Sequence, residues 1–478
     1  MSDEPKEMEA AESPESSGSM WGARFESIMA PEMVELNRSL PVDSCLWRED
    51  IRASKAWAQS LGRAGVLTSN KLGLMVDGLQ KVALRIDEEG LGKAHEEDIH
   101  SVVERMLVEV IGSLGGKLHT GRSRNDQSAT GVRLFGISAC NRMQEDLVRL
   151  CRGLEHLAMQ GLHLPMPGYT HLQQAQPIRA AHWVLSHAFA FLRDIDRIKT
   201  ARTSASVLPL GAGAIAGCPF SIDREALKDE LGFERVSSNS IDAVADRDWI
   251  CDVLYAAAMI GVHMSRLSED LVLFSSSGFG FIRLSDGFST GSSLMPQKRN
   301  PDVAELTRGK TGRLHGNLVN LLTLLKGLPT GYNRDLQEDK EALFDTCDTL
   351  GMTVPALSGA VETAEFVSER LEEAMDDQLF ATDLADYLVR QGVPFRETHE
   401  VVGKLVRISE EEGVPLSQLS LNTMQNEHQA FEQDVAKVFD WERSTEARDT
   451  VGGTSLRAVR EQLEEVDSQL SKIENEGK

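Results

Sequence analysis

The chain has 478 residues, enough to bury a large hydrophobic core and to form two or three domains. Its formal net charge of -24 argues against a nucleic-acid groove or an anionic membrane surface as a bulk partner. The sequence contains no apolar run that predicts a membrane-spanning helix. An anion-binding site in so acidic a protein has to be a local group of cations.

The first twenty residues are rich in Glu, Ser and Pro, and this composition predicts a disordered acidic tail. They resemble neither a secretory signal nor an Arg-rich transit peptide, which favours a cytoplasmic protein. The six cysteines are scattered, and none has a CxxC or Cys/His spacing typical of zinc sites. We therefore expect reduced thiols and no bound metal.

The rest of the chain shows mostly helical periodicity, which predicts a mostly α-helical fold. Apolar residues recur at threes and fours in four long stretches: 131–157, 177–205, 249–274 and the segment after Pro301. A helix of roughly thirty residues is about 45 Å long, which favours an extended, oligomeric bundle. Only FGFIRL, near Phe281, looks like a short extended piece. Boundaries near Thr120 and Arg370 give four predicted segments: the tail 1–20, an N-terminal helical domain 21–121, a central long-helix bundle 122–370 and a small C-terminal helical domain 371–478.

The first polar loop, KLHTGRSRNDQ, precedes the first long helix. Asn125 or Asp126 is a plausible N-cap, with Gly121 making the turn. Capping does not account for two arginines, which lie beside Thr120, Ser123 and Asn125. Guanidinium groups and amide donors at a helix N-terminus suit a carboxylate or phosphate, so the loop is a candidate anion site.

The second polar loop, PGYTHLQQAQP, leads into the next long helix. A lone histidine in a loop is more often solvated than catalytic. Here His171 has Thr170, Tyr169 and three glutamines around it, and prolines stand at both ends. A histidine with a pKa near its ordinary value of about 6.5 can exchange a proton at neutral pH.

The third polar loop, GSSLMPQKRNPD, runs from Gly291 to Asp302. Asn300 is a plausible N-cap for the following helix, with Pro301 at its first position. Capping does not account for the preceding residues, where Ser292 and Ser293 lie close to the cations Lys298 and Arg299. The glycines at 287 and 291 favour a loop that moves as a lid.

The three loops together resemble the fumarase/aspartase superfamily, whose GSSxMPxKxNP signature is matched at every fixed position. TGRSRNDQ, GYTHLQQAQP, SSNSIDAVADRDW and YNRDLQEDKE are similar to the argininosuccinate lyase family within it, as are WGARF and EEDIHSVVE. The resemblance extends from about Trp21 onward. It implies a three-domain, mostly α-helical subunit in a homotetramer whose active sites are shared between subunits. It also implies reversible β-elimination of argininosuccinate to arginine and fumarate, a step of arginine biosynthesis and the urea cycle, without a cofactor.

The resemblance also implies roles for individual residues. Ser292 matches the base that removes the carbon-bound proton, and His171, oriented by Glu305, lies at the leaving-group side. An isolated serine hydroxyl is a poor base, so nearby positive charge such as Lys298 and N–H donors have to favour the alkoxide. Asp98 and His100 correspond to supporting polar residues. The residues implied to bind substrate are Ser39, Ser123, Arg124, Asn125, Thr170, Asn300, Tyr332, Gln337 and Lys340.

The sequence departs from the family pattern at Ala23, Ser101 and Val103, which bears on substrate affinity more than on the type of reaction. Three alternatives stay open: another lyase of the superfamily such as adenylosuccinate lyase, a crystallin-like structural protein, and a helical scaffold. SRNDQ and YNRDLQEDKE favour argininosuccinate as substrate, and the complete set of site residues favours an enzyme.

Overall fold

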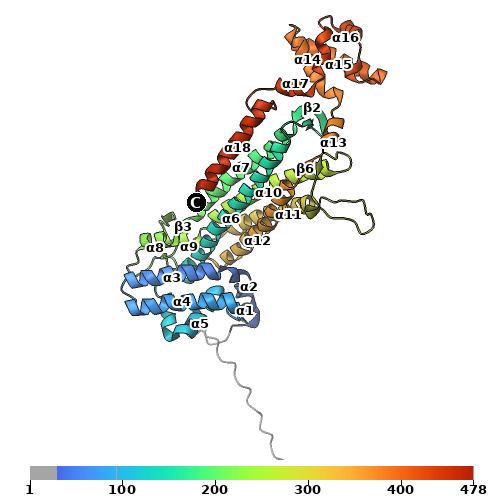
Figure 1. Cartoon of the computed structure of the whole chain (residues 1–478). Helices are drawn as coiled ribbons and strands as arrows, with labels where there is room; N and C mark the ends of the chain where they lie inside the picture. The colour runs from blue at the N-terminus through green and yellow to red at the C-terminus, as the bar shows by residue number, and fades with distance from the viewer. Residues whose placement is uncertain (1–28, 93, 477–478) are drawn as a thin grey trace, which may run out of the picture.

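The computed structural model describes residues 29–92 and 94–476, so the predicted acidic tail and Ala23 lie outside the described residues. The predicted mostly α-helical fold is confirmed. Figure 1 shows an elongated subunit with a helical region at each end of a long bundle. The N-terminal region comprises α1 (Pro31–Asn37), α2 (Leu40–Asp43), η2 (Ser44–Leu46), α3 (Trp47–Arg63), α4 (Ser69–Glu89), α5 (Ile99–Ile111) and η3 (Gly112–His119).

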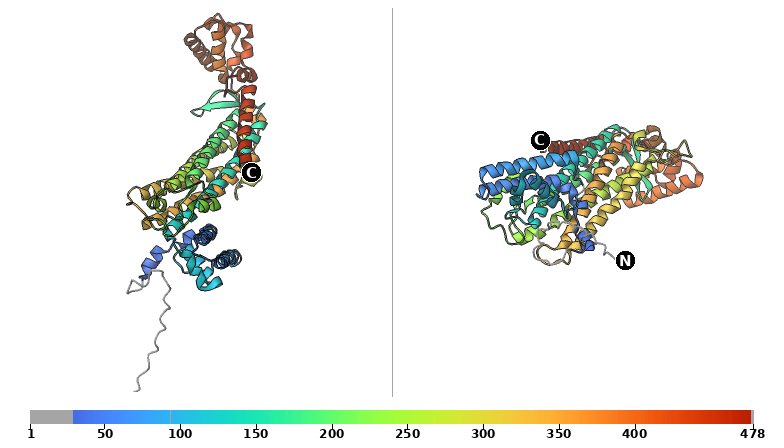
Figure 2. Two further views of the ribbon diagram at one scale, coloured as in Figure 1. Left: turned by 90° about the vertical axis from the view of Figure 1, so that its left-hand side faces the viewer. Right: turned by 90° about the horizontal axis from the view of Figure 1, so that it is seen from below.

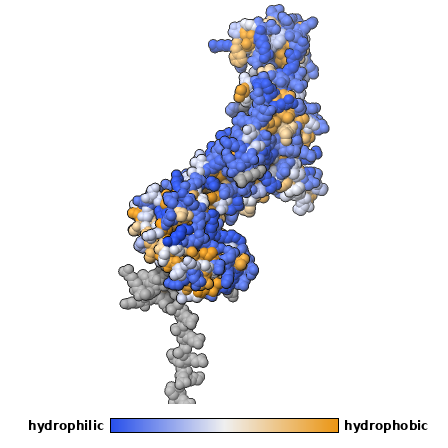
Figure 3. All heavy atoms as spheres, turned by 60° about the vertical axis from the view of Figure 1, so that its left-hand side comes forward, coloured by the Kyte–Doolittle hydropathy of each residue, from blue (hydrophilic) through white to orange (hydrophobic). Residues whose placement is uncertain are grey.

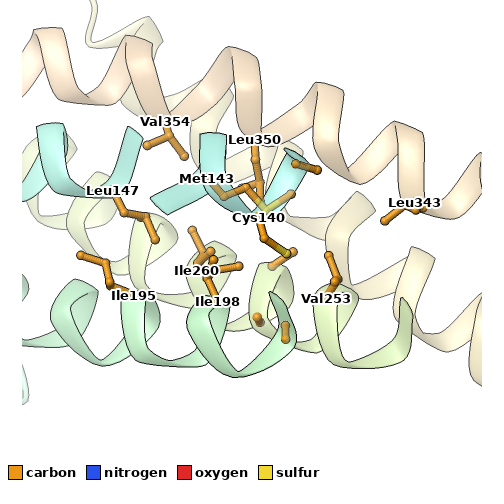
Figure 4. Packing of buried hydrophobic residues seen from close by; sticks show 14 of the residues in the cluster. Cys140, Met143, Leu147, Ile195, Ile198, Val253, Ile260, Leu343, Leu350 and Val354 are labelled. Carbon is orange, nitrogen blue, oxygen red and sulfur yellow. The ribbon is translucent and has the colours of Figure 1, made fainter. Parts of the chain in front are cut away.

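Five helices of 24 to 37 residues form the central bundle and run up and down along it. They are α6 (Arg124–Gln160), α7 (Ala180–Ala205), α10 (Asp248–Ser275), α11 (Asp302–Leu325) and α12 (Asp339–Glu362). Their apolar stripes meet in one core, where Met143, Ile198, Ile260 and Leu350 come from four different helices (Figure 4). The four long helices expected from periodicity are all present, because each carries a stripe wide enough to face several neighbours.

Helix α10 is long and apolar enough to cross a membrane, judged by length and composition alone. The prediction that no such segment exists was therefore wrong on those two criteria. However, 61% of the most apolar 18-residue stretch of α10 is buried inside the protein. Its apolar character follows from its place among the other bundle helices.

Short helices and small strand pairs connect the long helices. The connecting helices are α8 (Arg224–Leu231), α9 (Ser240–Ala245), η4 (Asp286–Phe288), η5 (Arg334–Glu338) and α13 (Ser368–Glu373). The strands pair two by two: β1 (Pro165–Thr170) with β2 (Gln173–Arg179), β3 (Val207–Leu208) with β4 (Arg235–Val236), and β5 (Ile282–Arg283) with β6 (Glu365–Phe366). The extended piece predicted near Phe281 corresponds to β5.

The β1–β2 hairpin was not predicted, because PGYTHLQQAQP was interpreted as a rigid loop. Its prolines hide the strand pattern in the sequence. Pro167 and Pro177 face each other across the two strands. Proline is tolerated in a two-stranded sheet because both strands are edges. Figure 2 shows the hairpin projecting sideways from the bundle, just below the C-terminal region.

The C-terminal region has a small hydrophobic core of its own, which includes Leu388, Leu405 and Phe431. It comprises η6 (Asp377–Phe380), α14 (Ala381–Arg390), α15 (Phe395–Glu412), η7 (Leu416–Gln418), α16 (Leu421–Glu427), η8 (Gln433–Val438) and α17 (Trp441–Glu446). The last helix, α18 (Leu456–Glu476), was expected to belong to this region. It lies instead along α6 and α7, and buries Val459, Val466 and Leu470 in the central core.

Candidate active site

Ser123 is the N-cap of α6. Its Oγ accepts a hydrogen bond from the Asn125 N–H at 3.2 Å, and Asp126 Oδ1 accepts from the Ser123 N–H at 2.9 Å. The prediction that Asn125 or Asp126 is the cap was therefore wrong. Asp126 is the third helical residue of a capping box. Its other oxygen accepts from the N–H groups of Gly211 and Gly213, and burial raises its pKa to about 6 despite these bonds.

Arg124 lies next to the cap and is held on three sides. Its guanidinium pairs with Asp98 at 3.1 Å and donates to Ser101 Oγ at 3.1 Å and to Gln127 Oε1 at 2.8 Å. Asp98 itself caps α5 by accepting from the Ser101 N–H. Ser101, one of the departures from the family pattern, thus still provides a hydroxyl to Arg124.

Behind Arg124 lies a buried group of polar side chains that includes His100, expected as a supporting residue, and Asp50, which the sequence patterns did not reveal. Asp50 Oδ1, on α3, accepts from Gln127 Nε2 at 2.7 Å and lies 2.7 Å from His100 Nδ1. Burial raises the pKa of Asp50, but His100, Arg122 and Gln127 outweigh burial and lower it well below its ordinary value. Because the Gln127 amide nitrogen donates to Asp50, the Gln127 side-chain carbonyl faces Arg124. We call Asp50, Asp98, His100, Ser101, Arg122, Arg124 and Gln127 the N-terminal polar cluster.

Ser39 lies at the edge of this cluster, where three distant segments meet. Its Oγ donates to Asp43 at 2.6 Å, and its N–H donates to the Glu97 carbonyl. Arg334 pairs with the Glu97 carboxylate at 2.5 Å, and Gln337 donates to the Asn37 carbonyl at 3.4 Å. The fold therefore brings Ser39 and Gln337 towards the same end of the bundle as Arg124.

Lys340 lies at the start of α12, at this same end, and is 5% exposed. Its Nζ lies 2.9 Å from Asp339 Oδ1, and Asp339 also pairs with the buried Arg247. This buried group has two cations and one carboxylate, so it carries one uncompensated positive charge. Nearby, Tyr332 packs against Ala212, Ala243 and Val244.

His171 and Leu172 form the exposed two-residue tip of the β1–β2 hairpin, and Thr170 ends β1 beside them. Both tip residues have positive φ, 57° and 58°. A type I′ turn needs this left-handed backbone, which costs a residue other than Gly, Asn or Asp of order 1–3 kcal/mol. Among the described residues, no hydrogen bond or ion pair involves the His171 side chain.

The Ser292 loop, residues 291–299, connects η4 to α11 and is exposed except at Ser292, which is half-buried. At its base, Thr290 and Asn300 exchange backbone hydrogen bonds at 3.2 and 2.8 Å, and Arg299 donates to the Leu284 carbonyl at 2.7 Å and pairs with Asp286 at 2.7 Å. Ser292 Oγ accepts from the N–H groups of Leu294 and Met295 at 3.2 and 3.1 Å.

Asn300 is not the N-cap of α11. Pro301 has that position, and α11 starts at Asp302. The prediction was one residue too early because Asn300 uses its backbone groups in the bridge to Thr290, and its side-chain amide also turns back towards Thr290. Lys298 is exposed on the loop, and Glu305 is exposed in the first turn of α11.

The predicted site residues thus form two groups within one chain. α6 has 37 residues, a length of about 55 Å, and separates the Ser123 cap from the hairpin that follows it. α11 has 24 residues, about 36 Å, and separates the Ser292 loop from Tyr332. One end therefore carries Ser39, Ser123, Arg124, Asn125, Tyr332, Gln337 and Lys340, and the other carries Thr170, His171, Ser292, Lys298, Asn300 and Glu305.

The two ends suit different chemistry. The first end offers buried or half-buried cations and hydroxyl groups, which suit carboxylate binding. The second end offers an imidazole and a serine hydroxyl that accepts two N–H bonds, which suit proton transfer. Within residues 29–92 and 94–476, no three or more His, Cys, Asp or Glu side chains are grouped so that they could hold a metal ion.

Comparison with known proteins identifies the family. A family model described as Lyase matches residues 24–316, and one described as Argininosuccinate lyase C-terminal matches residues 378–446. The argininosuccinate lyase of Roseiflexus castenholzii is 50% identical over 93% of this chain and 98% of its own length. The probable argininosuccinate lyase of Schizosaccharomyces pombe is 46% identical over 95% of this chain and 99% of its own length.

Solved structures agree on the fold. EDDS lyase in complex with formate superposes with a TM-score of 0.82 at 28% identity, covering 93% of this chain and 91% of that one. The class II fumarase of Schistosoma mansoni superposes with a TM-score of 0.70 at 16% identity, covering 88% of this chain and 92% of that one, which shows a shared fold. From the sequence relatives and the two family models together, the chain belongs to the argininosuccinate lyase family.

Proposed function

We propose that this protein cleaves argininosuccinate reversibly to arginine and fumarate, in the cytoplasm and without a cofactor. The observation that carries the proposal is the similarity to argininosuccinate lyases along 93% of the chain, with half of the aligned residues identical. The three polar loops that match the family lie at the two ends of the bundle, mostly half-buried or buried at one end and mostly exposed at the other. This arrangement supports an enzyme more than a structural protein or a scaffold.

Ser292 is the proposed base that takes the proton from the carbon next to a substrate carboxylate. The two N–H groups that donate to its Oγ favour the alkoxide, because hydrogen bonds to a charged form stabilise it. Lys298, on the same loop, adds positive charge. The carbanion formed is an aci-carboxylate, and fixed cations stabilise its charge as it develops. Lys298 and Asn300 are the proposed partners of that carboxylate.

His171 is the proposed group at the leaving-group side, where the C–N bond to the guanidinium breaks. Glu305 is the proposed partner that orients its imidazole. In one chain both side chains are exposed, and no hydrogen bond between them is observed among the described residues. The proposed pairing therefore involves His171 of one subunit and Glu305 of another.

The end of the bundle that carries the N-terminal polar cluster is the proposed substrate-binding end. Ser123, Arg124 and Asn125, with Thr170 from the hairpin, are proposed to hold the succinyl carboxylates. Ser39, Tyr332, Gln337 and Lys340 are proposed to hold the arginine portion. The uncompensated positive charge of the buried Arg247, Asp339 and Lys340 group supports this role, since a substrate carboxylate would neutralise it.

A complete site requires more than one subunit, because the proposed base and the proposed binding residues are separated by the length of the bundle. The surface of α11 supports a homotetramer formed around the long helices. Leu306, Val319 and Leu322 are 63%, 61% and 51% exposed in the single chain. A Cβ added at Gly309, Gly312 or Gly316 would touch nothing within 4 Å, so another helix has room to approach closely. Figure 3 shows that apolar patches also interrupt the polar surface along the molecule.

The test is turnover by the purified protein, followed as the rise in ultraviolet absorbance when fumarate forms from argininosuccinate. Adenylosuccinate and aspartate serve as control substrates, and size measurement in solution gives the oligomeric state. A folded protein that releases fumarate only from adenylosuccinate, or from none of the three, contradicts the proposal.

The shared site has its own test. Two inactive variants, Ser292→Ala and Arg124→Gln, are unfolded together and refolded as mixed oligomers. Some sites then combine an intact Ser292 with an intact Arg124, so we expect partial recovery of turnover. Mixed oligomers without any recovery contradict a site built from different subunits.

A further inference from the structure

Arg179, the last residue of β2, is fully buried at the base of the hairpin. Its guanidinium donates to the Leu162 carbonyl at 3.0 Å and to Glu446 Oε1 at 2.6 Å. The guanidinium carbon lies 5.3 Å from the centre of the Trp441 ring. The Arg179 N–H donates to Thr454 Oγ1 at 2.9 Å. A buried guanidinium needs such partners, because an unpaired charge in the interior is costly.

These partners belong to three different parts of the chain. Leu162 lies just after α6, Trp441 and Glu446 lie on α17 of the C-terminal region, and Thr454 lies between α17 and α18. Glu446 Oε1 also accepts from the Leu456 N–H at 2.8 Å, at the start of α18. Arg179 therefore joins the base of the hairpin to the bundle and to the C-terminal region at a single point.

The hairpin depends on its base for its direction. A two-stranded hairpin is only marginally stable by itself. Its tip carries His171 and Leu172 in the left-handed backbone conformation, which persists only where the surroundings enforce it. Two further contacts hold the strands: the Gln174 amide donates to the Ala374 carbonyl at 3.0 Å, just beyond α13, and the Tyr169 ring packs against Phe274 and Phe279 with centroids 6.2 and 5.8 Å away.

We propose that Arg179 is a positioning residue for His171. By tying the hairpin to Glu446 and Trp441, it sets the angle at which the tip reaches the active site. The C-terminal region thereby acts on proton transfer although it contributes no group that touches the substrate. This inference rests on the proposed function, because it assigns His171 to the lyase reaction.

The experiment compares Arg179→Met and Arg179→Lys with the wild-type protein, using full-length oligomers at a temperature where each remains folded. A displacement of about 1 Å at the reacting groups costs up to about 100-fold in rate, so we expect kcat of Arg179→Met to fall about 30-fold. KM should change much less, by no more than about fivefold, the equivalent of one hydrogen bond, because Thr170 is the proposed binding residue that moves with the hairpin. The kcat of Arg179→Lys should lie between that of the wild-type protein and that of Arg179→Met, because lysine carries the charge but cannot provide the same planar set of donors.

Glu446→Gln provides a second variant that leaves the buried arginine in place. The Glu446 side chain is 45% exposed, so the fold should tolerate this change. We expect kcat to fall about threefold, and the double variant with Arg179→Met to be no slower than Arg179→Met alone, because both changes remove one interaction. If Arg179→Met does not fold, Glu446→Gln alone tests whether Arg179 positions His171. An unchanged kcat of Glu446→Gln then overturns the inference.

The matched control is Arg152→Met. Arg152 lies on α6 and ties it to α18 by pairing with Asp467 and Glu474, but touches neither the hairpin nor α17. We expect this variant to lose stability while its kcat per folded oligomer stays unchanged. A wild-type kcat for folded Arg179→Met, or an equal loss in Arg152→Met, overturns the positioning role. Wild-type protein without turnover overturns the proposed function as well, so the two failures are distinguishable.

Discussion

The N-terminal polar cluster and the Ser292 loop contain the two kinds of group that the proposed reaction needs, but they are built in opposite ways. In the cluster, Arg124 contacts side chains of Asp98, Ser101 and Gln127, and Asp50 supports them from a fully buried position. In the loop, Ser292 Oγ accepts only from backbone N–H groups of its own turn, and the ties to the rest of the chain lie at the loop's base, in the Thr290–Asn300 bridge and at Arg299, which donates to the Leu284 carbonyl and pairs with Asp286.

This difference predicts that the proposed binding groups are held in place before substrate binds, while the proposed base is brought into place afterwards. A cation surrounded by side chains from several elements cannot shift without breaking several hydrogen bonds at once. An exposed loop that is tied only at its base moves at lower cost than such a cluster, as a lid must. Substitutions in the loop should therefore affect turnover without stability, and substitutions in the cluster should affect stability or substrate binding.

Ser292→Ala should produce the largest effect. We expect turnover to fall at least about 1,000-fold, because the proposed base is lost. The free energy of unfolding should change by less than about 0.5 kcal/mol, since Ser292 Oγ makes only local bonds in an exposed loop. Fumarate release and thermal unfolding give the two readings. Substantial remaining activity would show that another group removes the proton.

Asp50→Ala should have the largest effect on stability. Removing a buried carboxylate leaves His100 and Gln127 without their shared partner and leaves the positive charge of Arg122 less compensated. We expect a loss of about 3 kcal/mol in the free energy of unfolding, measured by chemical denaturation.

The control for Asp50→Ala is Asp87→Ala, which removes an exposed ion pair with Arg48 and should cost less than about 1 kcal/mol. Equal losses in the two aspartate variants would contradict the prediction that Asp50 stabilises the N-terminal polar cluster.

His119 should make the stability of this end of the molecule depend on pH. Burial, with the positive charge of Arg122 and Arg124, lowers the pKa of His119 to about 4. The unfolded chain takes up a proton near pH 6.5, whereas the folded chain does so only near pH 4, so stability is lost as pH falls through this interval.

Between pH 7 and pH 5, this difference in proton uptake lowers the free energy of unfolding by about 2 kcal/mol. We expect the wild-type protein to lose that much more stability than His119→Gln over the same pH change, measured by denaturation at both values. The same pH dependence in both proteins would refute this assignment.

Ser101→Ala should give the smallest effect. It removes one of the hydroxyl groups around Arg124 but leaves the Asp98 ion pair intact. The loss of one hydrogen bond worth about 1 kcal/mol should raise KM for argininosuccinate about fivefold, with kcat unchanged. A large fall in kcat would indicate that Arg124 acts in the chemical step itself.

The long helices were predictable because their signal is local and repeated. A stripe of apolar residues at threes and fours over 24 residues or more is typical of a long helix with one buried face, and α6, α7, α10 and α11 all lie where that pattern occurs. The two N-caps were less predictable, because Ser123 lies two residues before Asn125 and Pro301 lies next to Asn300, and asparagine also caps helices well. The hairpin was missed because proline opposite proline masks the alternation that usually reveals a strand.

The sequence by itself determined the fold class, the family and the residues that make up the three polar loops, since these depend on residue type and short spacing. Only the tertiary structure revealed that the loops lie at opposite ends of the bundle, that Asp50 supports Arg124 through Gln127, and that Arg179 ties the hairpin to α17. Asp50 and Gln127 are 77 residues apart in the chain, and Arg179 and Glu446 are 267 residues apart. No local pattern encodes such a pairing. The way the intervening helices pack against one another decides which polar groups meet.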